Sequence, residues 1–138
     1  MNAEDPEPRP LLVVDGANVV GSVPDGWWRD RRGAAERLRD RLAAAGGPVD
    51  GPYPGPYEIV LVLEGRARGV ASVPGVRVEE APGSGDDLIA ELARAARGRP
   101  CLVVTADREL RRRVEETGAR CVGPRSLPPA PGRTGSEE

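Results

Sequence analysis

Three short runs made almost entirely of apolar residues constrain the fold of this chain most. They cover residues 10–14, 58–63 and 102–105. Runs in which apolar residues follow one another, rather than alternating with polar ones, are typical of strands buried on both faces of a parallel sheet. Two parallel strands need a long crossover between them, which is usually a helix. The runs therefore predict strands and helices that alternate around a central sheet.

The segment between the first two runs has the spacing of a helix. Apolar residues recur at three- and four-residue intervals over residues 29–45, and Gly46 and Gly47 end the pattern. The link over residues 65–75 is barely long enough for a parallel crossover. The remaining expected elements are helices over residues 87–96 and 108–117 and short strands over 76–78 and 120–122. We expect one α/β domain with three layers, α/β/α, and a central parallel sheet.

Five carboxylates follow these strands or open a helix. Asp15, Glu64 and Asp107 come after the first, second and fourth strands, and Asp86 and Asp87 follow a glycine turn at the start of a helix. Right-handed crossovers place the carboxyl ends of the first and fourth strands side by side. Carboxylates that meet there cannot all stay ionised without a cation. The pattern predicts a divalent-metal site at this edge of the sheet.

Each carboxylate also has a simpler structural explanation. Asp15 fits an ordinary Asp-Gly turn, Asp107 a helix cap and Glu64 a solvated loop acid. The order Ser84-x-x-Asp87 resembles a capping box. Adjacent helical residues differ by about 100° in direction, so either Asp86 or Asp87 is the closer ligand and the sequence leaves the choice open.

Polar and aromatic residues near these acids are candidates for substrate contact. Asn18 is placed to orient a ligand or hold its loop, and Thr105 to hydrogen-bond Asp107 or a metal-bound water. Trp27 or Trp28 could stack on a base, with core packing as the alternative.

Arginines close to the same edge are candidates for phosphate contact, with an ordinary solvated loop as the alternative for Arg66 and Arg68. Arg66 and Arg68 follow the second strand, where guanidinium groups can bind phosphate oxygens in pairs. The run Arg111-Arg112-Arg113 is typical of a solvated helix face, with RNA backbone contact as the alternative.

Composition excludes several kinds of chemistry. The chain has no His, no Lys and 2 Cys, which rules out His-based acid–base catalysis, a four-Cys zinc site and a P-loop with its lysine. Cys101 and Cys121 lie in apolar runs and are expected to be buried free thiols. Any catalysis must depend on carboxylates.

Charge and apolar content divide the chain into a folded part and two tails. Residues 1–9 and 124–138 are rich in Pro, Gly, Ser and charged residues, which predicts flexible tails around a domain over residues 10–123. The formal net charge of −2 comes from the first tail, so the domain is neutral and its surface apart from the five acids is basic. The start of the chain lacks the features of a signal peptide or membrane segment, so we expect a cytoplasmic protein.

Three motifs together resemble the NYN branch of the PIN-like nucleases, and most closely its bacterial YacP-type members. They are Asp15-Gly16-Ala17-Asn18, Gly83-Ser84-Gly85-Asp86-Asp87-Leu88-Ile89 and Thr105-Ala106-Asp107, and the resemblance extends over residues 11–122. Glu64 departs from the family, which more often has Asp there. The resemblance implies a PIN-like, Rossmannoid fold and a Mg²⁺- or Mn²⁺-dependent endoribonuclease.

The function expected from residues and resemblance is hydrolysis of RNA phosphodiesters. The resemblance implies that the products carry 5′-phosphate and 3′-hydroxyl ends. The metal ligands would be Asp15, Asp107 and one of Asp86 and Asp87, with Glu64 as a further candidate. The expected partner is single-stranded or structured RNA and not a membrane, and a homodimer stays open. A nucleotide pyrophosphohydrolase and a non-catalytic RNA- or protein-binding module are the alternatives.

Overall fold

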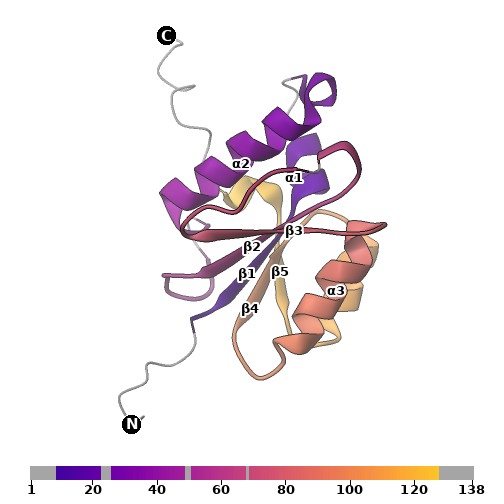
Figure 1. The fold of residues 1–138 in the computed structure, drawn as a ribbon. Helices are drawn as coiled ribbons and strands as arrows, with labels where there is room; N and C mark the ends of the chain where they lie inside the picture. The colour runs from indigo at the N-terminus through magenta and orange to yellow at the C-terminus, as the bar shows by residue number, and fades with distance from the viewer. Residues whose placement is uncertain (1–8, 23–25, 49–50, 68, 128–138) are drawn as a thin grey trace.

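The computed structural model describes residues 9–22, 26–48, 51–67 and 69–127. Their core is one five-stranded sheet in which every pair of neighbouring strands is parallel. The order of the strands across the sheet is β3-β2-β1-β4-β5 (Figure 1). The strands are β1 Leu11–Asp15, β2 Glu58–Leu63, β3 Val76–Glu80, β4 Cys101–Val104 and β5 Arg120–Val122. The expected α/β architecture with a central parallel sheet is confirmed.

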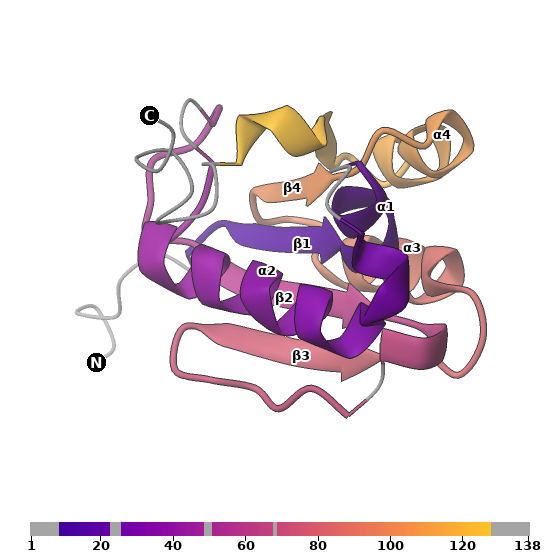
Figure 2. The ribbon, with the colours of Figure 1, turned by 90° about the horizontal axis from the view of Figure 1, so that it is seen from above.

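Helices cover both faces of this sheet (Figure 2). One apolar cluster packs the buried side chains of α1 and α2 against residues such as Leu12 and Leu61, and a second packs α3 and α4 against Val13 and Val60. The helices are α1 Gly16–Gly21, α2 Arg31–Ala45, α3 Gly85–Ala95 and α4 Arg108–Glu115. Because side chains alternate between the two faces of a strand, the apolar residues of β1 belong alternately to one cluster and the other. The three-layer arrangement is therefore present.

The register of the sheet brings the candidate residues to one edge. Asp15 at the end of β1 is aligned with Val62 near the end of β2, and Val14 is aligned with Val104 at the end of β4. The segments after these three strands carry Asn18, Glu64 and Thr105. The expected neighbourhood of the first and fourth strands is confirmed.

The structure corrects the expected elements at several points. The Asp15-Gly16 turn leads directly into a helix, α1, because the Asp15 side chain caps it. Among its described residues, the connection from β2 to β3 forms a short 3₁₀ helix, Gly65–Ala67, and no α-helix. α3 begins two residues earlier than predicted, at Gly85, because Ser84 is its cap.

The predicted C-terminal tail, residues 124–138, includes residues that are in fact part of the folded domain. Residues Pro124–Ser126 form a 3₁₀ helix, and the Leu127 side chain is buried in the cluster that holds α1 and α2. An apolar residue at this position can still reach the sheet because β5 ends only five residues before it.

Both cysteines are free thiols, as expected, but only Cys101 is fully buried and Cys121 is half-buried. Burial raises the pKa of Cys101 to about 11 and that of Cys121 to about 11, so neither is a reactive thiolate at neutral pH. Within the described ranges no helix is both long and apolar enough to cross a membrane.

Candidate active site

Asp15 is a charged side chain that the fold buries, with an exposed fraction of 5%. It ends β1 and caps α1, and its Oδ1 accepts a hydrogen bond from the Asn18 backbone N–H at 3.4 Å. The next residue must be glycine, because a Cβ on Gly16 would lie 2.6 Å from the Val62 carbonyl oxygen. The close approach of α1 to β2 therefore fixes where the Asp15 carboxylate lies.

Thr105 connects Asp15 to Asp107 across the β1–β4 pair. Its hydroxyl donates to Asp15 Oδ2 at 2.8 Å and accepts from the Asp107 backbone N–H at 3.1 Å. Thr105 is fully buried. The sequence left open whether this hydroxyl serves Asp107 or a metal-bound water, and in the structure it bonds to protein groups on both sides.

Two further contacts hold the loop between β4 and α4. Asn18 Oδ1 accepts from the Ala106 backbone N–H at 2.8 Å, and Arg111 Nε donates to the Thr105 carbonyl oxygen at 2.9 Å. Asp107 caps α4 by accepting from the Leu110 N–H at 3.1 Å. Asn18 thus holds the loop, and Asp107 has the capping role that the sequence offered as its structural explanation.

Glu64 joins the end of β2 to the start of α3. Its Oε2 accepts from the Gly85 N–H at 3.1 Å, and a Cβ on Gly85 would lie only 3.0 Å from the same oxygen. The carboxylate therefore lies against a helix N-terminus, where a negative charge is favoured. Glu64 is half-buried, so the alternative of a freely solvated loop acid is wrong.

The two aspartates of α3 have different surroundings. Ser84 caps the helix because its hydroxyl oxygen accepts a hydrogen bond from the Asp86 N–H at 3.1 Å. The Asp87 carboxylate instead pairs with the Arg113 guanidinium at 3.1 Å. The expected Ser84–Asp87 capping box therefore does not form. The Asp87 side chain is 83% exposed, whereas Asp86 is half-buried and makes no side-chain hydrogen bond within the described part of the chain.

Electrostatic repulsion links the carboxylates of this edge. Burial is the main cause that raises the pKa of Asp15; its bonds to Thr105 and Asn18 oppose this, and the charges of Asp86 and Glu64 add to it. The pKa of Asp86 is also raised, first by burial and then by the charges of Asp107 and Glu64, while Arg113 lowers it. Negative charges from four elements therefore act on one another here.

The donors suit Mg²⁺ or Mn²⁺ in chemistry, because both cations prefer carboxylate oxygens. The repulsion among them is what a cation would relieve. As they stand, however, no three Asp, Glu or Cys side chains of the described residues are close enough together to hold one ion. Asp15, Glu64 and Asp107 each accept a hydrogen bond from the protein, whereas Asp86 makes none within the described part of the chain, so movement of Asp86 would most readily complete a ligand set.

The tryptophans differ in exposure. Trp28 is 52% exposed, and Trp27 is half-buried, with its ring edge-to-face to that of Trp28 at 6.0 Å between centroids. Arg31, which the sequence did not single out, lies over the Trp27 ring at 5.0 Å from its centroid. No local motif marks Arg31, since it is one of several arginines at the start of α2.

The other predicted arginines have mixed outcomes. Arg68 and the side chain of Arg66 lie outside the part of the chain that the structure describes. In the α4 run, Arg112 pairs with Glu109 on the surface, as a solvated face predicts. Arg111 and Arg113 instead reach the candidate site, through Thr105 and Asp87.

Comparisons with known proteins find similar folds among solved structures. No protein-family model and no curated protein matches the chain. Among solved structures it is similar to a mutant of Rae1 (YacP) from Bacillus subtilis, with a TM-score of 0.66 and 21% identity over 86% of this chain and 72% of that one. It is equally similar to unmutated Rae1, with a TM-score of 0.66 and 20% identity over 85% of this chain and 70% of that one. The resemblance to YacP-type proteins is therefore confirmed at the level of the fold.

Proposed function

We propose that this protein is a metal-dependent endoribonuclease that hydrolyses RNA phosphodiester bonds. The observation that supports this most is that the charges of Asp15, Glu64, Asp86 and Asp107 act on one another around one sheet edge, where burial and these charges raise the pKa values of Asp15 and Asp86. A buried carboxylate that is penalised for ionising gains stability from a cation. Perturbed carboxylates of this kind occur often at functional sites.

The residues that would hold Mg²⁺ or Mn²⁺ are Asp15, Asp107 and Asp86, with Asp87 and Glu64 as further candidates. The ion would lower the pKa of a water molecule and neutralise the charge that develops on the phosphate during hydrolysis. The neighbouring side chains prepare this site: Thr105 orients the Asp15 carboxylate, and Asn18 fixes the backbone before Asp107. In this reaction a water oxygen would bond to phosphorus while the P–O3′ bond breaks. The leaving O3′ would take up a proton, so the products carry 5′-phosphate and 3′-hydroxyl ends.

Phosphates beyond the cleaved one would be bound by arginines. Among the residues that the structure describes, Arg113 is a candidate for such a phosphate contact, because it pairs with Asp87 at the candidate site. Arg66 and Arg68 follow Glu64 in the chain and remain predicted phosphate contacts. Guanidinium groups bind phosphate oxygens through paired hydrogen bonds.

One experiment tests the function directly. The purified protein is incubated with structured and with single-stranded RNA, in Mn²⁺ or in EDTA, and the product ends are mapped. We expect internal cuts that require the metal and carry 5′-phosphates. Hydrolysis of nucleoside triphosphates without RNA cleavage would favour a pyrophosphohydrolase, and RNA binding without any hydrolysis would favour a non-catalytic module.

A further inference from the structure

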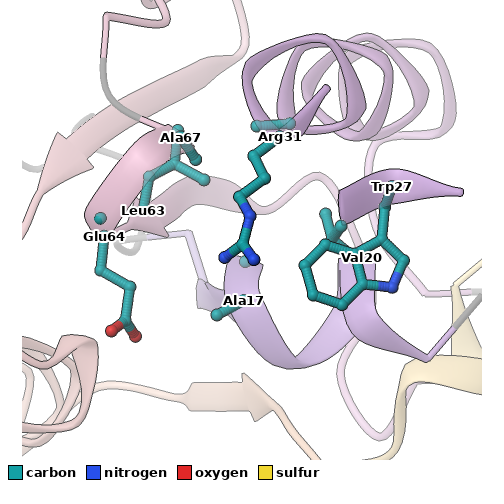
Figure 3. A pocket seen from close by; sticks show the side chains of 10 residues that line it. Ala17, Val20, Trp27, Arg31, Leu63, Glu64 and Ala67 are labelled. Atoms are coloured by element: carbon teal, nitrogen blue, oxygen red, sulfur yellow. The ribbon is translucent and has the colours of Figure 1, made fainter. Parts of the chain in front are cut away.

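A pocket of about 200 Å³ opens between α1, α2 and the segment after β2. Apolar residues of these elements form most of its lining, and Trp27, Arg31 and Glu64 supply its aromatic and charged side chains. Figure 3 shows the Arg31 side chain reaching between the Trp27 ring on one side and Glu64 on the other. Drug-sized ligands fill roughly 300–1,000 Å³, so this pocket suits a single small ring system.

Arg31 lacks an anionic partner among the described residues. Its guanidinium group forms no ion pair with a carboxylate of these residues, and it lies against the Trp27 ring in a cation–π contact. The five-donor guanidinium group binds phosphate oxygens well, because two of its N–H groups can bond one phosphate together. A cation without a counter-ion at a largely apolar pocket therefore favours an anionic ligand that also carries an apolar part.

Trp27 gives the pocket an aromatic wall. Its ring is half-buried and lines the pocket, whereas the neighbouring Trp28 does not line it. Bases of single-stranded nucleic acids stack on such rings and on guanidinium planes. An aromatic ring beside an arginine matches the two halves of a nucleotide.

The pocket adjoins the candidate active site. Glu64 lines it and also acts electrostatically on Asp15 and Asp86. Gly16, which directly follows Asp15, is a second shared residue. A group bound in the pocket would therefore be close to the bond that the carboxylates would cleave.

From these contacts we infer that the pocket receives one unpaired nucleotide of the RNA, next to the cleaved bond. Its base packs against Trp27 and the apolar lining, and its phosphate binds the Arg31 guanidinium. The inference rests on the proposed function and deepens it: it assigns to this pocket a base-binding subsite that a base paired within a duplex cannot enter.

The two tryptophans provide the experiment. They are the only 2 in the chain, so Trp28→Leu leaves Trp27 as the sole tryptophan, and Trp27→Leu is the matched control. In EDTA, which prevents cleavage, a short unstructured RNA should quench the emission of Trp28→Leu. The same RNA annealed to its complement should not quench it. Trp27→Leu should weaken binding about 5- to 150-fold, the loss typical of one stacked base, and Trp27→Phe should restore most of it.

Arg31 is tested by the salt dependence of binding. Arg31→Gln should reduce the slope of log K against log salt by about 0.7, the value for one phosphate of a single strand. Arg37→Gln lies on the same helix outside the pocket and should leave the slope unchanged.

The two proposals fail in different ways. Wild-type protein that cleaves RNA, with no quenching of Trp28→Leu and unchanged affinity of Trp27→Leu, would overturn the pocket and leave the nuclease standing. Quenching by duplex equal to that by single strand would also overturn the pocket. Wild-type protein that neither binds nor cleaves RNA would overturn both.

Discussion

The two sides of β1 provide the candidate site with very different surroundings. On the β4 side, hydrogen bonds join Asp15, Thr105, Asn18 and Asp107 into one network that includes four backbone N–H groups. On the side of β2 and α3, one hydrogen bond of a described carboxylate joins the two segments. It runs from the Gly85 N–H to Glu64. We call the β4 side the fixed side and the other the mobile side, because Asp86 makes no side-chain hydrogen bond among the described residues and is expected to move most readily.

This difference indicates how a cation could be bound by a site that does not hold three ligands together as it stands. The fixed side defines a position, because the Asp15 carboxylate cannot turn without losing its bond to the buried Thr105 hydroxyl. The mobile side supplies the remaining charge, and a cation would draw it in. Ligands oriented in advance cost less to organise on binding than ligands that must be ordered.

The largest effect should come from the fixed side. Asp15→Asn is expected to reduce Mn²⁺-dependent RNA cleavage to background, because it removes the one buried charge of the site. Its thermal midpoint should stay the same or rise slightly, since Asn still accepts from Thr105 and the penalty for a buried charge is gone. Cleavage assays and thermal unfolding measure the two effects. Asp40→Asn, an exposed change on α2, is the matched control, and an active Asp15→Asn would exclude the assignment of this site.

The Thr105 bridge should matter next, and for stability as well as activity. Thr105→Val keeps the shape but leaves Asp15 Oδ2 and the Asp107 N–H without their partner. We expect a loss of about 1–3 kcal/mol in the free energy of unfolding, the usual cost of an unsatisfied buried group. Urea denaturation measures it. Thr105→Ser retains the hydroxyl and should recover most of the loss; equal losses in both variants would mean that packing, not the bridge, is what counts.

The sequence predicted the fixed side better than the mobile one. Buried strands leave long apolar runs, and the order of the strands follows from right-handed crossovers, so the positions of Asp15 and Thr105 at one edge could be predicted. Their direct bond could not, because it depends on the register of β1 against β4.

The start of α3 was harder to predict because two structures fit the same residues. The order Ser84-x-x-Asp87 is compatible with a capping box, and only the packing of α4 shows that Asp87 pairs with Arg113 instead. The pocket at Trp27 was missed for a related reason. It is assembled from α1, α2 and the end of β2, and no local pattern records that these segments meet.

Metal binding should change the mobile side more than the fixed side. We expect Mn²⁺ to raise the thermal midpoint, because an ion that binds only the folded state stabilises it. Hydrogen exchange should slow more in the first turn of α3 than at residues 105–107. The thermal shift should shrink in Asp107→Asn, where Asn can still cap α4. Equal slowing of hydrogen exchange on both sides, or an unchanged thermal midpoint at millimolar Mn²⁺, would contradict the proposed difference between the fixed and the mobile side.

The smallest effect concerns the cation that already lies on the mobile side. Arg113 pairs with Asp87 and lowers the pKa of Asp86, so it competes with a metal ion for the same negative charge. Arg113→Gln should strengthen Mn²⁺ binding by up to about fivefold, which corresponds to the ~1 kcal/mol between unit charges about 4 Å apart in water. Its stability should change by less than about 1 kcal/mol, because the ion pair is exposed.

Calorimetric titration of Arg113→Gln with Mn²⁺ measures the gain in affinity. Arg112→Gln is the matched control, since Arg112 lies on the same helix and also forms a solvent-exposed pair, with Glu109 instead of Asp87. It should leave Mn²⁺ affinity unchanged. If both variants gained equally, the effect would be one of overall charge, and Arg113 would have no specific place beside the carboxylates. If Arg113→Gln weakened Mn²⁺ binding, the pair with Asp87 would instead be part of what holds the mobile side in position.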